Sequence, residues 1–288
     1  MTTILITGAT GNIGMEVLNA LTNMSHQSAV YAGVRDIGLD SKKTAKFKVG
    51  NIHFDFTDNK TYKPALQNID ILFLLRPPQI SNVNLYFKPL IDIAKQLSVK
   101  HIVFLSVQGV EKSKIIPHHK IEQLILESKI PYTFLRPAYF MQNFTTTLHD
   151  DLVNKKRIYL PAGNSKFTLV DVSDVGEVTA KILTEIKNHV NMSYELTSNE
   201  KLTFSEMAFK LSNGLNRIIN YISPGLFSFY LTKRRENIPA ALIIVMIMLH
   251  YLPRFQKEPQ TTNCIKNILK REPKSFDQFI TENKTNLC

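Results

Sequence analysis

The chain has 288 residues, of which 44% are hydrophobic and 20% charged, and this ordinary globular composition excludes wholesale disorder. The formal net charge of +11 comes from scattered lysines and from two short clusters, 155–157 and 233–235, that lack the interleaved aromatic residues of a nucleic-acid surface. Cys264 and Cys288 are too few for a disulfide framework or a metal cluster. We therefore expect a cytoplasmic protein with no metal, and nucleic acid is the least favoured partner.

Apolar and helical patterns alternate along the first half of the chain. Short, continuously apolar runs predict buried strands, and runs with apolar residues every three to four positions predict helices. In chain order, we expect strands over 3–7, 29–34, 46–54, 70–75, 101–106 and 132–136, and helices over 12–23, 60–67, 82–97 and 117–128. Such strands, separated by helices, indicate an α/β fold with a doubly wound, Rossmann-type parallel sheet. A rival (β/α)₈ barrel would place its phosphate-binding turn late in the chain.

The pattern changes near residue 138, where helices become dominant. Short strands are expected there over 157–160, 167–170 and 193–196. We therefore expect a main Rossmann domain over 1–150 and a smaller, mostly helical lobe over 151–288. The lobe shares a core with the main domain and is where we expect a substrate or a partner to be recognised.

Neither the start of the chain nor its longest apolar run predicts a membrane segment. Residues 1–7 run into glycines without the basic start of a signal peptide. The longest apolar run, 238–252, contains Pro239 and His250. At about 15 residues, this run is short of the roughly 20 that span a bilayer. We expect it to form a buried helix.

Gly8, Gly11 and Gly14 form a GxxGxxG pattern between the first expected strand and the first expected helix. The first glycine of such a turn allows a tight bend, the second lets backbone approach a pyrophosphate, and the third lets helix and strand pack closely. The N–H groups at the helix start would hold the phosphates, with the hydroxyls of Thr7 and Thr10 nearby. The alternative is a glycine turn that only packs. No P-loop Lys-Ser/Thr pair follows, which disfavours a kinase or an ATPase.

Polar residues follow the second and third expected strands. An acidic residue at the tip of the second strand would bind the ribose of NAD, whereas an arginine suits the extra phosphate of NADP. Because Arg35 comes first and Asp36 second, NADP(H) is favoured over NAD(H), the alternative being that Arg35 is a solvated surface residue. After the third strand, Asp55 would accept from the adenine amino group and Phe56 would pack on the ring. Residues 57–58 would cap the next helix.

Several segments together carry a family resemblance: 6–14 (ITGATGNIG), 76–78 (RPP), 105–109 (LSVQG), 118–123 (HHKIEQ), 130–137 (IPYTFLRP) and 271–279 (REPKSFDQF). In combination they resemble the atypical short-chain dehydrogenase/reductases, and within them the NmrA-like group, over nearly the whole chain. The resemblance implies an NAD(P)-binding protein. Members of the group include NADPH-dependent quinone reductases, isoflavone-reductase-like enzymes and redox-sensing regulators that bind the dinucleotide without turning it over.

The resemblance also implies which residues contact the cofactor. They lie in the glycine turn, at the tip of the second strand and after the fourth and fifth strands. Carried over by position, they are Gly8, Thr10, Gly11, Asn12, Ile13, Gly14, Arg35, Leu75, Arg76, Pro77, Ser106 and Val107.

The chain departs from the catalytic pattern of short-chain reductases in one respect. Those enzymes use a tyrosine that donates a proton and a lysine four residues later that lowers its pKa. Counting back from Glu122, which resembles a glutamate of the same helix, the lysine position holds His118 and the tyrosine position holds Lys114. His118 would either hold the ribose or donate a proton itself, since imidazole titrates near neutrality. The alternative is a residue at a helix start with no role.

Two main hypotheses for function follow from these residues. The first is an enzyme that uses NAD(P)H to reduce a quinone or a similar electron-poor carbonyl compound, with Tyr139 and Phe140 lining the substrate pocket unless they only pack in the core. The second is a non-catalytic dinucleotide sensor that binds a regulatory protein partner. A sugar-nucleotide epimerase or dehydratase is disfavoured because it relies on the missing Tyr-Lys pair. The sequence does not predict an oligomeric state.

Overall fold

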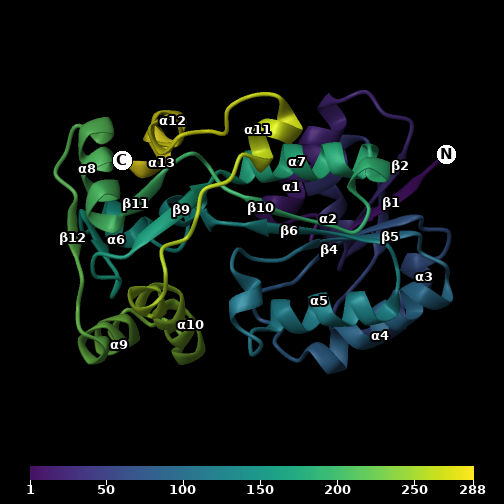
Figure 1. Ribbon diagram of the computed structural model, residues 1–288, viewed down its shortest axis with the longest axis horizontal. Helices are drawn as coiled ribbons and strands as arrows, with labels where there is room; N and C mark the ends of the chain where they lie inside the picture. The colour runs from purple at the N-terminus through teal and green to yellow at the C-terminus, as the bar shows by residue number, and fades with distance from the viewer. The chain divides into compact units, whose positions relative to one another are not determined.

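The computed structural model describes residues 1–288 and divides the chain into two compact units (Figure 1). Unit 1 is built from 1–138, 172–196 and 264–271, and unit 2 from the remaining segments, 139–171, 197–263 and 272–288. This division differs from the single boundary expected at residue 150. The physical reason is that a strand and two helices from the second half of the chain pack into unit 1.

Unit 1 contains a seven-stranded sheet in the order β10-β6-β5-β4-β1-β2-β3, with every neighbouring pair parallel. The expected Rossmann-type sheet is therefore confirmed. β10 was expected among the strands of the later lobe, but it pairs with β6 at the edge of this sheet. The strands are β1 (Thr3–Ile6), β2 (Ala29–Val34), β3 (Gly50–His53), β4 (Ile71–Leu75), β5 (His101–Leu105), β6 (Tyr132–Pro137) and β10 (Met192–Leu196).

Helices cover both faces of this sheet (Figure 1). The face with α1 (Asn12–Asn23) also carries α7 (Val172–Thr184) and α11 (Cys264–Leu269), and the other carries α3 (Tyr62–Leu66), α4 (Val83–Gln96) and α5 (Pro117–Ser128). In α1, Val17, Leu18 and Leu21 are buried and fall on one side of the helix, as the helical period predicts. A further helix, α2 (Ile37–Thr44), contacts β2 and β3.

The third strand is shorter than expected. The segment 46–54 was expected to be extended, but Ala45–Phe47 forms a 3₁₀ turn (η1) and Lys48 has a positive φ of 53°. The chain therefore reverses before β3 begins at Gly50. Other 3₁₀ turns of unit 1 are η2 (Asn59–Thr61), η3 (Val110–Lys112) and η5 (Ile186–His189).

Unit 2 combines small sheets with helices around an aromatic core. One sheet has the order β11-β9-β7 and a second pairs β12 with β8. Its buried cluster includes Phe144, Phe204, Phe276 and Phe279. The elements are β7 (Tyr139–Phe140), η4 (Met141–Thr145), α6 (His149–Val153), β8 (Arg157–Tyr159), β9 (Lys166–Val170), β11 (Lys201–Thr203), α8 (Phe204–Leu215), β12 (Asn220–Ile222), α9 (Leu226–Arg235), α10 (Ala240–Tyr251), η6 (Leu252–Phe255), α12 (Phe276–Glu282) and α13 (Lys284–Leu287).

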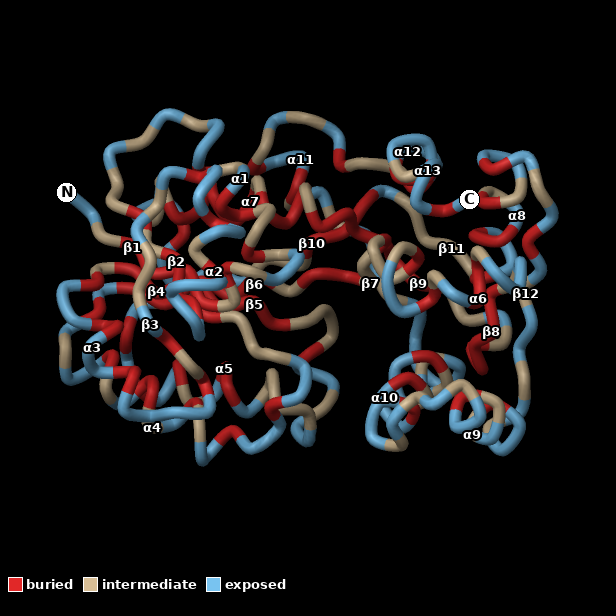
Figure 2. Tube along the Cα trace, turned by 180° about the vertical axis from the view of Figure 1, so that it is seen from behind, coloured by how far each residue is buried: buried red, intermediate tan, exposed pale blue.

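The apolar run 238–252 forms the expected helix, α10, but the expectation that it is buried is wrong. Only Ile243, Met246 and His250 are buried within it, and Figure 2 shows exposed and intermediate segments along the helix. The reason is that α10 packs on the rest of unit 2 by one side only. No helix of the structure is both long enough and apolar enough to cross a membrane.

Candidate functional site

The glycine turn has the geometry that its spacing predicts. Gly8, directly after β1, has a positive φ of 62°, a backbone conformation that favours glycine. A Cβ atom on Gly14 would lie 2.2 Å from the Gly8 carbonyl oxygen, so no side chain fits there. A Cβ on Gly11 would meet only that same oxygen, at 3.3 Å. The turn is therefore tight at Gly8 and Gly14, and at Gly11 one backbone oxygen is the only close neighbour of a Cβ.

The first turn of α1 follows Gly11 and is not capped by a side chain. Gly11 is the N-cap residue, and no side chain accepts a hydrogen bond from the first turn of the helix. The first N–H groups of a helix lack partners within it and carry the positive end of the helix dipole. An uncapped end that opens beside a glycine suits an anion such as a phosphate.

The turn lies at the point where the strand order of the sheet reverses. β1 pairs with both β2 and β4, so the chain runs outward on either side of this point. In doubly wound sheets, ligands bind at this switch point, beyond the carboxyl ends of the strands. Thr7 joins the two central strands: its hydroxyl donates to the Phe73 carbonyl at 2.9 Å and accepts the Leu75 N–H at 3.0 Å. Of the two hydroxyls expected near the phosphates, that of Thr7 is therefore engaged within the sheet.

The two charged residues at the tip of β2, Arg35 and Asp36, differ in their contacts. Asp36 is the N-cap of α2, and its carboxylate accepts the Leu39 N–H at 3.0 Å. Arg35 is exposed. Both charged side chains at this tip are therefore exposed, but the carboxylate of Asp36 is engaged as the cap of the helix that follows.

The residues after β3 are engaged within their own loop. The Asp55 carboxylate accepts from the N–H and the hydroxyl of Thr57, both at 2.8 Å. Phe56 is buried, with ring centroids 4.8 Å from Phe54 and 5.4 Å from Phe87. Asp58 caps the next turn, as one reading of the sequence expected. The adenine contacts proposed for Asp55 and Phe56 remain predictions.

Ser106 follows β5, and its hydroxyl is left without a partner. The residue is 2% exposed, and its Oγ atom makes no hydrogen bond within the protein. A buried hydroxyl normally has a partner, because an unmet one costs free energy. Val107, the next predicted contact residue, is partly exposed. Because parallel strands end at one edge of the sheet, Ser106 lies at the same edge as the glycine turn.

Arg76 lies in the loop after β4 and His118 in the first turn of α5, and they contact each other directly. The Arg76 Nε atom donates to His118 Nε2 at 3.3 Å. Its Nη1 atom donates to the carbonyl oxygens of Pro77 and Pro78, each at 3.1 Å, and of Ile80 at 2.7 Å. The loop that follows Leu75 therefore closes around its own guanidinium group. Sequence reasoning placed both residues near the cofactor but missed their contact.

The environment of His118 fixes its protonation. Burial, together with the charge of Arg76, lowers the pKa of His118 to about 3, so the imidazole is neutral at physiological pH. Because guanidinium groups only donate, Nε2 accepts and the proton lies on Nδ1. This low pKa disfavours the expected proton-donor role at neutral pH, and a role for His118 stays a prediction. A neutral hydrogen-bond donor at Nδ1 remains.

The helix that carries His118 is anchored to the sheet one turn further on. Glu122 is 3% exposed and accepts two hydrogen bonds from Arg136 at the end of β6, from Nε at 3.1 Å and from Nη2 at 2.7 Å. His118 and Glu122 are four residues apart on α5 and share one face of it. The bidentate pair thus holds the start of α5 at the carboxyl edge of the sheet.

The two residues predicted for a substrate pocket belong to unit 2. The Tyr139 ring packs edge-on against Phe167 and Phe204, and its hydroxyl lies 3.2 Å from His250 Nε2. Phe140 is partly exposed. The core-packing alternative considered for Tyr139 is therefore realised for its ring. A role in substrate binding stays a prediction for both residues.

One polar pair at the sheet edge was not anticipated. Gln108 follows Ser106, and its Nε2 atom donates to Glu195 of β10 at 3.0 Å. The signal for Gln108 was its position shortly after a buried strand. The signal for Glu195 was a charge within an expected strand, but the sequence did not indicate that β10 lies beside β6.

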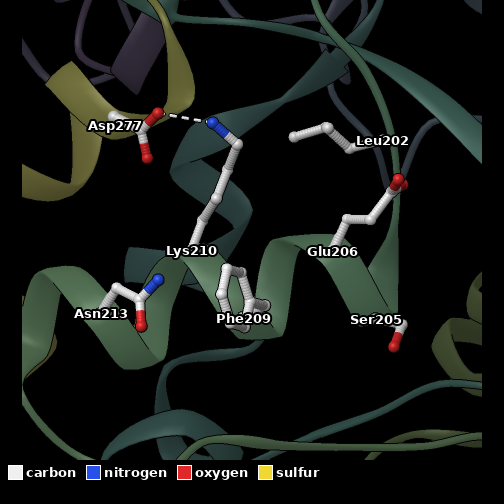
Figure 3. A pocket seen from close by; sticks show the side chains of 7 residues that line it. All are labelled: Leu202, Ser205, Glu206, Phe209, Lys210, Asn213 and Asp277. Carbon is white, nitrogen blue, oxygen red and sulfur yellow. Dashed lines mark hydrogen bonds and ion pairs between the residues drawn. The ribbon is translucent and has the colours of Figure 1, made fainter.

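Two surface depressions are lined by other residues. One, in unit 2, is lined by residues of α8 and by Asp277, and Figure 3 shows Lys210 reaching across it to Asp277. The other, in unit 1, lies at the amino ends of β1 and β2. Neither contains a residue of the glycine turn, Arg76, Ser106 or His118, and we assign no function to them.

Comparison with known proteins adds relatives along the full length of the chain. The model of the NmrA-like family matches residues 1–245. Prestalk A differentiation protein A of Dictyostelium discoideum is 27% identical, with 98% of this chain and 93% of that protein covered. An NAD(P)H azoreductase of Xenophilus azovorans is 26% identical, with 96% of each covered.

Solved structures with the same fold include both an enzyme and a regulator. The NADPH-dependent quinone oxidoreductase of Escherichia coli, complexed with NADPH, superposes with a TM-score of 0.88 at 20% identity, with 97% of this chain and 99% of that chain covered. NmrA, a negative transcriptional regulator in complex with NADP, gives 0.74 at 17% identity, with 98% and 94% covered. At these identities the superpositions establish the fold alone.

Proposed function

This chain belongs to the NmrA-like family, and we propose that it is an NAD(P)H-dependent oxidoreductase that reduces a quinone or a similar small, electron-poor carbonyl compound. The observation that carries the proposal is the open, uncapped helix start beside Gly11 at the switch point of the sheet. Relatives along the whole chain support it, because one is named as an NAD(P)H azoreductase and a structural neighbour as a quinone oxidoreductase.

The residues at the sheet edge fit a dinucleotide. Gly11 leaves room for a pyrophosphate against backbone, and the uncapped N–H groups of α1 supply donors for it. The buried Ser106 hydroxyl, which has no partner within the protein, fits a polar group of the ligand. When bound, the dinucleotide supplies the hydride, and the protein supplies orientation and exclusion of water.

A preference for NADP(H) over NAD(H) forms part of the proposal. It depends on Arg35, which is exposed at the tip of β2, while the neighbouring Asp36 is engaged as a helix cap. A guanidinium group is well matched to a phosphate and offers nothing specific to a ribose hydroxyl. The 2′-phosphate of NADP(H) would therefore gain a partner that NAD(H) does not use.

His118 acts in this proposal as a neutral hydrogen-bond donor. Arg76 holds its Nε2 atom, which leaves the Nδ1–H free to orient a ribose or a substrate oxygen. No imidazolium is available to serve as an acid at neutral pH. A quinone tolerates this, because its reduced form can take protons from water. Carbonyl substrates that need a strong proton donor are correspondingly disfavoured.

The absence of a strong proton donor favours a second candidate, a dinucleotide sensor that does not turn the cofactor over. A site that lacks the Tyr-Lys pair and has a neutral histidine contains few groups that could donate a proton to a substrate. A structural neighbour, NmrA, is named as a transcriptional regulator in complex with NADP. In this second proposal the chain binds the dinucleotide and passes its state to a protein partner.

Calorimetry with NADPH and NADH, followed by NADPH oxidation with a panel of quinones, tests both proposals. Binding with turnover supports the reductase, and binding without turnover supports the sensor. Gly11→Asp should abolish binding, because the new carboxylate occupies the opening and repels phosphate. Gly225→Asp is the matched control, since it adds the same side chain at another helix N-cap where nothing lies within 4 Å of a Cβ. Unchanged NADPH binding by Gly11→Asp would refute the cofactor assignment.

A further inference from the structure

Unit 2 carries exposed apolar side chains on three elements that contact one another in series, α9, α10 and the turn η6. We call this part of the molecule the α9–α10 surface and define it by its exposed large apolar side chains: Phe227, Leu231, Leu242, Ile244, Val245, Met248, Leu249, Leu252 and Phe255. The exposed fraction reaches 78% at Phe227, 57% at Leu249 and 72% at Phe255. α9 and α10 lie side by side in both views (Figures 1 and 2). Patches of this kind on a protein surface mark contact sites.

The outer face of α10 contains no polar side chain at all. At about 100° per residue, its exposed positions fall on one arc of the helix, and they are occupied by Ala, Leu, Ile, Val and Met alone. A helix at a water-facing surface normally has a polar outer face. The inner face is also apolar, with Ile243 and Met246 packed into the core of unit 2. The inner face of α10 therefore completes the core of unit 2, and the apolar side chains of the outer face do not contribute to that core.

Cations border this surface, and carboxylates are missing from it. Between Glu236 and Glu258 the chain contains no acidic residue. Arg234 and Arg235 end α9, and Arg254 and Lys257 follow α10, all of them exposed.

Both flanking acids are already paired with lysines or arginines. Glu236 contacts Lys155, Arg157 and Lys233, and Glu258 contacts Lys166 and Lys201. The border of the surface therefore has a net positive charge.

We propose that the α9–α10 surface binds the face of an anionic lipid bilayer. Apolar side chains would enter the boundary between headgroups and acyl chains, and the flanking arginines and Lys257 would meet the anionic headgroups. α10 has 12 residues and is therefore about 18 Å long, too short to cross a hydrocarbon core of about 30 Å. The helix lies on the membrane in this arrangement and does not span it.

A second copy of the chain is the main competing occupant, and charge disfavours it. In a two-fold dimer the same patch faces itself. Arg235, Arg254 and Lys257 of one copy would then border the same cations of the other, with no carboxylate of the surface to pair with them. An anionic bilayer instead offers the opposite charge to every one of these groups.

Flotation of the full chain with lipid vesicles tests the proposal. We expect binding to vesicles that contain phosphatidylglycerol, weak or no binding to pure phosphatidylcholine, and loss of binding at high salt. The double variant Ile244→Gln, Leu249→Gln replaces two exposed apolar side chains with good helix formers and should weaken binding about tenfold or more. Phe209→Gln is the matched control, because Phe209 is 67% exposed on α8, outside the surface.

A charge variant separates the two contributions. Arg235→Gln, Lys257→Gln should lower binding to anionic vesicles, while Lys63→Gln, Lys95→Gln removes the same charge from unit 1 and should not. Failure of the wild-type chain to float with anionic vesicles would overturn the proposal. Binding that survives the Ile244→Gln, Leu249→Gln change would overturn it too. So would sedimentation as a dimer that this variant converts to a monomer, since that result assigns the surface to a second copy.

Discussion

The Nε–H of Arg76 donates to Nε2 of His118 across 3.3 Å, and this contact leaves the imidazole proton on Nδ1, while burial first and the Arg76 charge second lower the pKa of the ring. Arg76 is itself held by three carbonyl oxygens of its own loop. The loop after β4 therefore sets the chemistry of a residue on α5. Because these hydrogen bonds hold the guanidinium group beside the ring, its positive charge contributes to the low pKa of His118.

Removal of the Arg76 charge should raise the pKa of His118. In Arg76→Gln the cation that disfavours imidazolium is gone, whereas burial of the ring remains, so the pKa should move from about 3 toward its ordinary value near 6.5. Proton NMR of the histidine Cε1–H signals across pH measures this shift directly. Arg35→Gln is the control, because that arginine lies at the tip of β2 and makes no contact with His118. A His118 signal that does not move in Arg76→Gln would contradict the proposed cause.

Replacement of His118 should impair catalysis more than cofactor binding. His118→Phe keeps a ring in the site but removes the Nδ1–H, so we expect NADPH affinity to change little and kcat to fall about tenfold or more. His118→Asn keeps a donor and should restore part of the rate. Equal loss in both variants would indicate a packing role for the ring.

Arg35→Ala should weaken NADPH binding about tenfold or more and leave NADH binding nearly unchanged, because only NADPH carries the 2′-phosphate. Calorimetry with both nucleotides measures the difference. Lys63→Ala removes one charge elsewhere on unit 1 and serves as the control for net charge. An equal loss of both affinities would count against this role of Arg35.

Gly14→Ala should destabilise unit 1 much more than Gly11→Ala. The Cβ added at position 14 would lie 2.2 Å from the Gly8 carbonyl oxygen, and the helix or the turn would have to shift, at a cost of about 1–3 kcal/mol. The Cβ at position 11 meets that oxygen at 3.3 Å with nothing else nearby. Denaturant unfolding of the two variants makes the comparison, and similar midpoints would show that the close approach does not constrain the fold.

The protein should lose stability on mild acidification. Burial lowers the pKa of His101 and of His250 to about 4, below the ordinary value near 6.5. The unfolded chain therefore binds more protons than the folded one between these values, so the free energy of unfolding falls as pH drops through about 6.5. For His250 alone the loss between about pH 7 and about pH 5 is on the order of 2 kcal/mol.

Denaturant midpoints measured across pH test this prediction. His250→Gln should lower stability at neutral pH, since the ring bonds Met246 and Tyr139, but it should also flatten the pH dependence. An unchanged slope in this variant would assign the acid sensitivity to other groups.

Local patterns predicted the first half of unit 1 well. The segments 12–23, 29–34 and 117–128 have the bounds that periodicity gave, because strand and helix choice there depends on neighbours in sequence. The glycine turn was predictable for the same reason: Gly8, Gly11 and Gly14 act within seven residues.

Long-range features were not predictable from the same patterns. β10 was expected as a strand, but its pairing with β6 across more than fifty residues leaves no local mark. Arg76 and His118 are 42 residues apart and meet only because β4 and β5 are neighbours in the sheet. For α10, the apolar run predicted the helix. Composition alone did not indicate which side of the helix would be covered by other elements and which would stay exposed.

The interleaving of the two units constrains the order in which the chain can fold as it is synthesised. Residues 1–138 supply six of the seven strands, but β10 and α7 follow the first excursion into unit 2, and α11 follows the second. The ion pairs from Arg271 to Asp174 and Glu177 hold this last segment to α7. A nascent unit 1 therefore remains incomplete until the chain has been translated through residue 271, and both units can be completed only when nearly the whole chain has been synthesised.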